Sequence, residues 1–233
     1  TKLQLYETIA PLIDEEILGF TDYHPLQGIL HEEGTRLFHT LLANHIYDKG
    51  SASIANYIGV LVDTFGSDYS EVQLVDEQGE AVVFADVGGE MEPLLLNGPN
   101  TNYNYFLYTM RNGNQYLSPN FRMSYETVTE ALQNMTIEAN DIYQTVILPN
   151  VIFDVKDKGD TVIIRFTEPL DLLAYDDVQV MQMVEGILLT AASFGKQVQF
   201  ENVIQGEWGG FVFGSPLPVP LAANRFEEQM IFE

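Results

Sequence analysis

The sequence of 233 residues contains no cysteine. That absence excludes disulfide bonds, thiolate nucleophiles and zinc sites built on thiolate ligands. It is consistent with an exported protein from an organism that does not rely on disulfides. Long hydrophobic runs are also missing, since no stretch approaches the roughly 18 apolar residues that indicate a membrane-spanning helix. No signal peptide is visible. The chain begins at Thr1 rather than at methionine, and we expect that a targeting segment or a membrane anchor has been removed.

Basic residues are scarce. Ten Lys and Arg stand against 34 Asp and Glu, which gives a formal net charge of −24 at pH 7. Such a surface repels the phosphates of nucleic acids and anionic lipid head groups, so no nucleic-acid partner is expected. A field of this sign attracts cationic partners or keeps a protein soluble, and solubility is the simpler interpretation. Hydrophobic residues still make up 46% of the chain, enough for one large domain or two of ordinary size.

Histidine is absent from most of the chain. The four histidines, His24, His31, His39 and His45, lie within 22 residues. No two of them have the i,i+4 spacing of a helical metal site, and no H-E-x-x-H motif occurs. His39 falls in a strand pattern, where we expect it to face solvent. The sequence therefore predicts scattered surface histidines rather than a metal site.

Two other motifs fail on spacing. The acidic stretch Asp154–Asp160 resembles a calcium-binding loop, but lysines occupy positions 3 and 5 of the EF-hand pattern. A charged hairpin turn is the better interpretation. The glycine-rich stretch Gly206–Gly214 is not followed by a helix whose free N–H groups could hold a phosphate.

Paired carboxylates occur at Ile13–Glu16 and Tyr175–Asp177. Acid–base catalysis needs two carboxylates that converge in a cleft, and we expect these pairs to serve local structure instead. No G-x-S-x-G motif is present. The sequence therefore predicts no catalytic, cofactor-binding or metal-binding residues, and a protein that is not an enzyme.

The clearest secondary structure lies in the second half. A helix is predicted from Asp176 to Phe194, with Asp176 or Asp177 as its N-cap and Gly195 as a left-handed C-cap. The alternating stretch Lys196–Val203 predicts a half-buried strand, and residues 207–214 are expected to return as its hairpin partner. Apolar residues recur along the helix at spacings of three and four and predict one buried stripe: Val180, Met181, Val184, Ile187, Leu188, Ala191 and Phe194.

The first half repeats this pattern. It predicts a helix capped by Ser51 or Ser53 and ended by Gly66, followed by a strand, a turn and a strand over residues 71–87. Two matches between the halves, at offsets of 129 and 126, pair Phe65-Gly66 with Phe194-Gly195 and Val72-Gln73 with Val198-Gln199. The difference in offset predicts a loop that is three residues longer after the first helix.

The correspondence continues upstream. Tyr6–Ile13 matches Tyr125–Leu132, and Ile29–Leu42 matches Ile152–Phe166. Each segment of the second match reads as a strand, a tight polar turn with glycine and another strand. A shared order of segments at a near-constant offset indicates duplication. A chance resemblance between two similar supersecondary units is the alternative.

The second unit opens with a segment that the first lacks. Tyr103–Met123 predicts a hairpin in which Asn112-Gly113 supplies the positive φ angles of a tight turn. In the first unit only Lys2–Tyr6 lies at the corresponding place. We interpret this segment either as a hairpin that has been cut short or as an N-terminal strand that pairs differently. We expect domains at residues 1–97, with an incomplete opening hairpin, and at residues 98–233, with a proline-rich C-terminal tail.

The second half reads in order as the Asn112–Asn114 turn, "YLSPNFRMS", "ETVTEALQNM", "DKGDTVIIRF", a helix ending in "LLTAASFG", and "KQVQFENV". This order resembles the GerMN-domain proteins of Gram-positive spore formers, well over residues 102–203 and weakly over residues 6–76. The phrases "MVEGILLTAASFGKQVQFENV" and "PLPVPLAANRF" are most similar to the extracytoplasmic region of anti-sigma-X factors (sigma-X negative effectors). The GerM sporulation and germination lipoproteins come next.

The resemblance implies an α+β fold of two tandem GerMN-like units, each an antiparallel or mixed sheet packed against two helices. It implies a non-catalytic, extracytoplasmic regulatory or interaction region, anchored to the cell membrane by a segment outside this chain. The expected partners are proteins of the cell envelope and, through a missing cytoplasmic segment, a sigma factor. The resemblance carries over no ligand, no cofactor and no functional residue.

Two alternatives stay open. A GerM-type sporulation and germination lipoprotein would carry the same tandem units. An acidic extracellular hydrolase or carbohydrate-binding protein is suggested by the acidity and by Tyr103, Tyr105, Tyr108 and Trp208. A deep, aromatic-lined cleft with two converging carboxylates would favour this second alternative.

Overall fold

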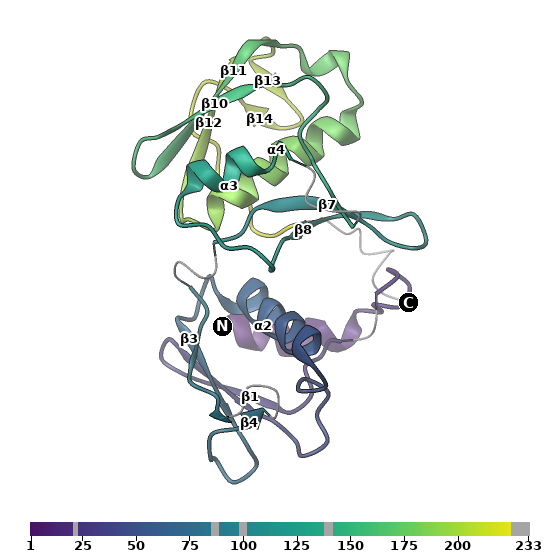
Figure 1. Ribbon diagram of the computed structural model, residues 1–233, viewed down its shortest axis with the longest axis vertical. Coiled ribbons are helices and arrows are strands. Elements are labelled where there is room, and N and C mark those ends of the chain that lie inside the picture. The colour runs from purple at the N-terminus through teal and green to yellow at the C-terminus, as the bar shows by residue number, and fades with distance from the viewer. Residues whose placement is uncertain (21–22, 85–88, 98–101, 138–141, 225–233) are drawn as a thin grey trace. The chain divides into compact units, whose positions relative to one another are not determined.

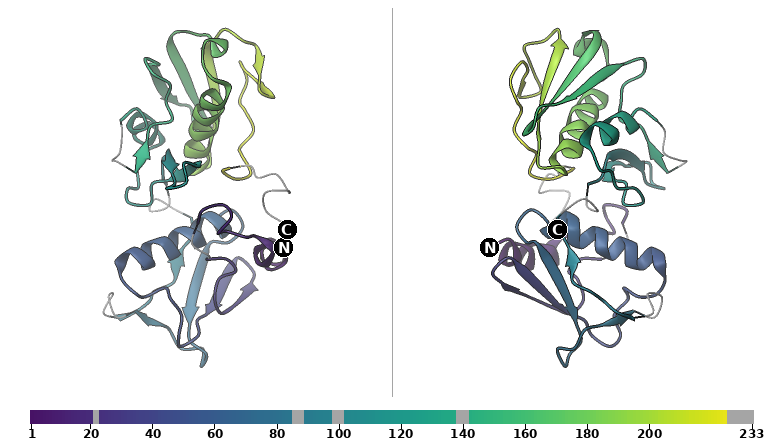
Figure 2. Two further views of the ribbon diagram at one scale, coloured as in Figure 1. Left: turned by 90° about the vertical axis from the view of Figure 1, so that its right-hand side faces the viewer. Right: turned by 60° about the vertical axis from the view of Figure 1, so that its left-hand side comes forward.

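In this computed structural model the described residues are 1–20, 23–84, 89–97, 102–137 and 142–224. The chain divides into two compact units, called unit 1 (residues 1–101) and unit 2 (residues 102–225) (Figures 1 and 2). The predicted boundary between residues 97 and 98 adjoins a segment outside the described residues. Both units combine helices with a mixed sheet, which confirms the predicted α+β class.

Unit 1 comprises α1 (Lys2–Ile9), the 3-10 helix η1 (Ala10–Leu12), β1 (Ile29–Glu33), β2 (Arg36–Thr40), α2 (Ser51–Phe65), β3 (Glu71–Val75), β4 (Val83–Phe84), β5 (Gly89–Glu90) and β6 (Leu94–Leu95). Its main sheet has the order β1-β2-β3-β6, with β2 and β3 parallel and the other pairs antiparallel. Helix α2 connects the parallel strands and covers one face of the sheet (Figure 2). Leu37, Val72 and Leu74 are buried in the core of this unit.

Unit 2 comprises β7 (Tyr105–Thr109), β8 (Gln115–Pro119), α3 (Val128–Asn134), β9 (Tyr143–Gln144), β10 (Phe153–Asp157), β11 (Thr161–Leu170), the 3-10 helix η3 (Leu172–Ala174), α4 (Asp177–Ala192), β12 (Gln197–Val203), β13 (Glu207–Trp208) and β14 (Phe211–Val212). β10 and β11 pair antiparallel, and β11 and β12 pair parallel. A second sheet has the order β8-β7-β9. Helix α4 lies between the two sheets (Figure 1).

The two units share one frame of hairpin, helix, parallel strand and small hairpin. The N-caps of α2 and α4 are Gly50 and Asp176, and the strands that follow begin at Glu71 and Gln197, so both landmarks differ by 126 positions. The next neighbour in the sheet corresponds as well. Val72 of β3 pairs antiparallel with Leu94, and the equivalent Val198 of β12 forms an antiparallel bridge with Leu217. This correspondence of topology and register supports duplication of one folded unit.

The predicted offset of 129 at the ends of the helices is wrong. Phe65 is the last residue of α2, whereas Phe194 lies two residues beyond the end of α4. Helix α4 is one residue longer than α2, and the loop after it is one residue shorter, so the offset stays at 126. The shared Phe-Gly dipeptide therefore does not mark equivalent positions, and the expected three-residue difference in loop length is absent.

The helix caps follow prediction in unit 2 and depart from it in unit 1. Asp176 accepts hydrogen bonds from two backbone N–H groups at the start of α4, and Gly195 adopts a φ of +69°. In unit 1 the N-cap is Gly50, without a side-chain hydrogen bond, and Ser51 is already helical. Gly66 has a φ of −63°, and a Cβ there would lie 2.5 Å from the carbonyl oxygen of Leu96. Gly66 therefore permits a close approach of two backbone segments.

The predicted N-terminal strand is wrong, because Lys2–Ile9 forms helix α1. Thr1 caps this helix through a capping box with Gln4, which satisfies donors at both residues. In unit 2 Thr127 caps α3, so the matching Tyr-Glu-Thr triplets lie at opposite ends of their helices. The full opening hairpin exists in unit 2 as β7 and β8, and Gly113, with a φ of +90°, supplies the positive φ of its turn while Asn112 does not.

The expected pairing of residues 207–214 with the strand before them is also wrong. β13 and β14 pair with each other through a turn at Gly209-Gly210, whose φ angles are +58° and +85°. Two consecutive glycines with positive φ allow this tight turn, so the segment closes on itself. Strand β12 instead pairs with β11 and, through Val198, with Leu217 of the proline-rich tail.

Candidate functional site

All four histidines lie in unit 1, in different surroundings. The ring of His31 is exposed and stacks on Phe38 with 4.7 Å between centroids. His24 Nδ1 lies 2.9 Å from the hydroxyl of Tyr6. Within the described ranges there is no group of three or more histidine, cysteine, aspartate or glutamate side chains that could hold a metal ion. These imidazoles therefore make separate local contacts.

His39 contradicts the expectation that it faces solvent, because it is 0% exposed. Its Nε2 lies 2.8 Å from the carbonyl oxygen of Gln27, and its Nδ1 lies 2.5 Å from the hydroxyl of Tyr57 on α2. A carbonyl can only accept, so Nε2 carries the proton and Nδ1 accepts from the tyrosine. Burial lowers the pKa of His39 to about 4; the hydrogen bond to Gln27 opposes this shift, and His45 adds to it. The imidazole is therefore neutral at pH 7.

Tyrosines extend this buried network. The rings of Tyr47 and Tyr57 stack with 4.1 Å between centroids, and the Tyr47 hydroxyl accepts a hydrogen bond of 2.6 Å from the backbone N–H of Gln27. Burial raises the pKa of Tyr57 well above its ordinary value, and burial raises the pKa of Tyr6 to about 12. These phenols stay protonated at neutral pH, so the network stabilises the interior and offers no anionic nucleophile.

The paired carboxylates serve local structure, as the sequence predicts. Glu15 accepts hydrogen bonds from two backbone N–H groups in the segment before β1, and Asp176 caps α4. At the turn that resembles a calcium loop, Lys196 Nζ lies 2.9 Å from a carboxylate oxygen of Asp157. The hydrogen bond from this lysine lowers the pKa of Asp157. Glu15 and Asp176 are thus committed to backbone N–H groups of the chain.

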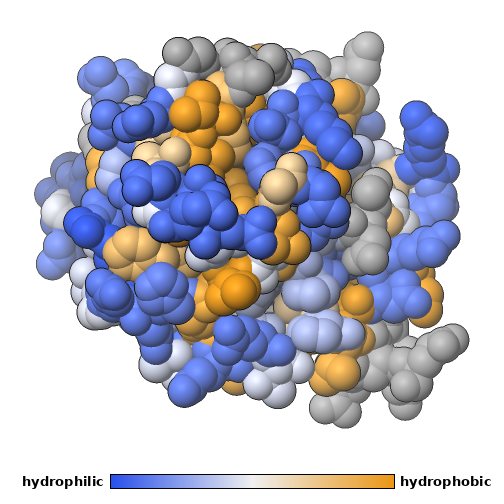
Figure 3. Space-filling model, turned by 90° about the horizontal axis from the view of Figure 1, so that it is seen from below, coloured by the Kyte–Doolittle hydropathy of each residue, from blue (hydrophilic) through white to orange (hydrophobic). Residues whose placement is uncertain are grey.

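Three of the four aromatic residues that suggested a carbohydrate-binding cleft pack into unit 2. Tyr103 and Tyr105 are each 8% exposed, and Trp208 packs against the core of unit 2. On the face of the molecule in Figure 3, hydrophobic side chains lie in separate patches among hydrophilic ones. The burial of Tyr103 and Tyr105 and the packing of Trp208 do not favour a hydrolase or carbohydrate-binding cleft lined by these three residues.

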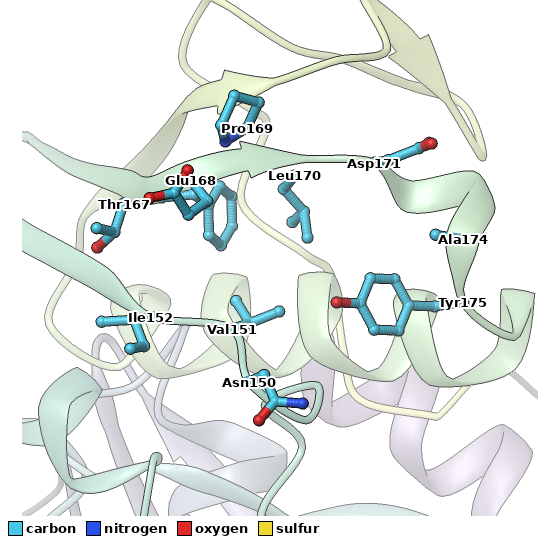
Figure 4. A pocket seen from close by; sticks show the side chains of 11 residues that line it. Asn150, Val151, Ile152, Thr167, Glu168, Pro169, Leu170, Asp171, Ala174 and Tyr175 are labelled. Carbon is cyan, nitrogen blue, oxygen red and sulfur yellow. The ribbon is translucent and has the colours of Figure 1, made fainter.

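A pocket of about 320 Å³ lies in unit 2, where β11 leads into η3 (Figure 4). The hydroxyl of Tyr175 points into it toward Val151 and Leu170, and Glu168 lies on the opposite side. The carboxylate of Asp171 points away from the pocket, where it accepts hydrogen bonds from the backbone of η3 and from a glutamine side chain. The pocket can therefore hold an apolar group beside one phenol and one exposed carboxylate.

A larger groove of about 550 Å³ lies between the first turns of α4 and the sheet of β7, β8 and β9. Glutamine side chains from both sides line it, over an apolar floor that includes Leu107 and Val146. Sequence reasoning missed both sites, because their residues come from segments that are distant along the chain. The four groove glutamines share no spacing that could have marked them as a group.

Comparison with known proteins finds similarity to a curated protein and to a solved structure. No family model matches the chain. The anti-sigma-X factor RsiX of Bacillus subtilis (strain 168) is 27% identical over 159 residues, which are 68% of this chain and 42% of that protein. The chain thus matches less than half the length of its curated relative. The tandem GerMN domains of the sporulation protein GerM from Bacillus subtilis superpose with a TM-score of 0.56 and 13% identity, over 84% of this chain and 77% of that chain.

These comparisons confirm the resemblance seen in the sequence, to anti-sigma-X factors and to GerM. The structural match covers 84% of this chain and therefore extends over both units. This chain is accordingly similar in sequence to the anti-sigma-X factor RsiX and has the fold of tandem GerMN domains.

Proposed function

We propose that this chain is the non-catalytic, extracytoplasmic regulatory region of a membrane-anchored anti-sigma factor of the sigma-X negative effector type. The observation that carries the proposal is the 27% identity to RsiX over 68% of the chain. The anchor and the sigma-binding segment would lie outside this chain. Among the described residues, no helix is long and apolar enough to cross a membrane.

The chemistry of the interior supports a role in interaction rather than in catalysis. The buried histidine and its tyrosine neighbours are neutral and are committed to one another. The candidate carboxylates cap helices or bind backbone N–H groups. Function then rests on surfaces, and each unit offers an edge strand, β1 in unit 1 and β10 in unit 2, beside exposed helix faces.

In the proposed mechanism, an envelope component docks on these surfaces. A signal changes that docking, or changes access of a protease to the region, and thereby releases a sigma factor on the other side of the membrane. The severe negative charge favours an envelope partner with basic or uncharged surface over an anionic one.

A GerM-type sporulation and germination lipoprotein is the second candidate. It is favoured by the structural match to GerM, which covers 84% of this chain. The two candidates differ in what precedes the described region. A cytoplasmic segment and one membrane helix would support the anti-sigma factor, and a signal peptide with a lipidated cysteine would support the lipoprotein.

The test uses the full-length protein in a bacterial strain that carries its sigma factor and a reporter gene under that factor's control. We expect the protein to repress the reporter and to co-purify with the sigma factor. Replacing residues 1–233 with an unrelated folded domain should leave the sigma-binding segment intact and abolish the response to envelope stress. A reporter that ignores the full-length protein, together with no bound sigma factor, would contradict the proposal. A sporulation defect in a deletion strain would then support the GerM-type role.

A further inference from the structure

The groove beside α4 is lined mainly by uncharged residues, although the chain as a whole is strongly acidic. Its volume is about 550 Å³, within the range of ordinary ligand sites. Four of the chain's 13 glutamines line it, although they come from three separate elements of unit 2: Gln115 from β8, Gln144 from β9, and Gln179 and Gln182 from α4.

The side-chain amides of the groove are largely uncommitted. Those of Gln144, Gln179 and Gln182 make no hydrogen bond with any other residue in the part of the chain that the structure describes, and that of Gln115 bonds only to the Thr109 hydroxyl, at 3.3 Å. The carboxylate in the lining belongs to Asp176, which already accepts the first N–H groups of α4. The walls are therefore nearly neutral, and each amide can both donate and accept.

The floor of the groove is apolar and lies beside a segment that joins no sheet among the described residues. Leu107, Val146, Ile147 and Leu148 are all buried and line it. Strand β9 lies at the edge of its sheet, and the segment 145–148 that follows it pairs with no strand among the described residues. An extended peptide segment in this groove would contact apolar side chains on the floor and glutamine amides on both sides.

We propose that this groove binds an extended, uncharged peptide segment of a protein partner, with its apolar side chains on the floor and its main-chain amides bonded to the glutamines. The N–H and C=O groups of an extended chain match the two-way hydrogen bonding of glutamine amides. No lysine or arginine lines the groove to hold an anion, and no aromatic ring lines it to stack on a sugar. The proposal rests on the interaction role proposed above and gives it a place in unit 2.

The test selects peptides against purified chain 1–233 from a phage-displayed library of random 12-residue peptides. Dissociation constants of the selected peptides are then measured by calorimetry. The groove variant is Gln179→Leu with Gln182→Leu, which keeps side-chain length and removes the amides. The control is Gln133→Leu with Gln197→Leu, two exposed glutamines of unit 2 outside the groove. Far-UV circular dichroism and the fluorescence of Trp208 report that each variant is folded.

We expect the selection to yield uncharged peptides with alternating apolar residues. Their affinity for the groove variant should be at least about tenfold weaker, as the loss of two hydrogen bonds predicts, and their affinity for the control variant should be unchanged. If the groove variant does not fold, the single variant Gln144→Leu serves the same comparison. No enriched peptide, or peptides that bind the groove variant normally, would overturn the proposal. So would binding of N,N′,N″-triacetylchitotriose that the groove variant loses, because the ligand would then be a glycan.

The two tests can fail separately. Peptide binding by the purified chain does not depend on a sigma factor, and the reporter experiment does not depend on the groove. The groove substitutions can also be placed in the full-length protein. If the reporter response is then lost, peptide binding in the groove is part of the signalling proposed above. A normal response with those substitutions would show that the groove serves no part in signalling.

Discussion

Units 1 and 2 build the same frame around different interiors. The strand registers make Val72 equivalent to Val198, and their partners Leu37 and Val162 are equivalent in turn. Two residues further along, His39 in unit 1 stands where Ile164 stands in unit 2, and both are 0% exposed. This position in the sheet therefore needs a buried side chain that fills the core. A polar side chain is tolerated there when its hydrogen-bonding groups all find partners.

The second difference lies on the far side of the central helix. Helix α4 is covered by a second sheet, and its residues Met183, Gly186 and Thr190 are buried although they lie off the predicted stripe. At Gly186 a Cβ would lie 2.9 Å from a methyl group of Val146. Thr190 accepts a hydrogen bond from the backbone N–H of Tyr105 on β7. One apolar stripe is enough to place a helix on a sheet, and a second layer adds close contacts and specific hydrogen bonds.

The largest expected difference between the units is their response to acid. The pKa of His39 falls from 6.5 in the unfolded chain to about 4 in the folded one, so the unfolded state binds the proton first as pH falls. Its contribution is complete above pH 6.5 and declines by about 3 kcal/mol between pH 6.5 and 4. Unit 2 contains no histidine and lacks this loss.

Urea unfolding at several pH values measures this loss. Trp208 is the one tryptophan and reports on unit 2, and a variant with Phe38→Trp and Trp208→Phe reports on unit 1. The control is His39→Gln in the unit 1 reporter, which has no imidazole to protonate. If that control loses as much stability between pH 6.5 and 4 as its parent, His39 is not the cause.

A matched deletion in both cores comes next in size. Val72→Ala and Val198→Ala remove the same two methyl groups from equivalent positions that are both 0% exposed. Each should lower the unfolding free energy by about 2 kcal/mol, through lost burial and the cavity left behind. The two tryptophan reporters measure which transition moves. If each substitution shifts both transitions equally, the units unfold together and the comparison of separate cores does not hold.

The last comparison concerns the two glycines after the helices, and the smallest expected effect is at Gly195. Gly66→Ala should cost about 2 kcal/mol, because the added methyl meets backbone carbonyl oxygens. Gly195→Ala should cost about 1 kcal/mol, because alanine resists a φ of +69° although the surrounding space is open. Asparagine tolerates that φ, so Gly195→Asn should recover part of the loss and Gly66→Asn should not. Thermal unfolding measures all four variants, and equal recovery at both sites would contradict the two causes.

Local patterns predicted much of the frame. The alternation before residue 204, the helix from Asp176 and the paired hairpins all have short-range causes, namely burial of one strand face, a capping carboxylate and turn glycines. The wrong predictions equated identical residues of the two halves, although tertiary contacts place those residues differently. The Phe-Gly dipeptides look equivalent, yet in one unit the phenylalanine ends the helix and in the other it follows it.

The sequence by itself indicated the order of hairpin, helix and strand after residue 28 and its repetition in the second half, because each element depends on side-chain periodicity over a few neighbouring residues. The α+β class followed from the family resemblance. Only the tertiary structure decided that His39 is buried and neutral, that β12 pairs with the tail rather than with the next hairpin, and that four glutamines meet in one groove. These features depend on contacts between residues tens of positions apart. Such contacts are chosen by the packing of the whole unit, and no local pattern records them.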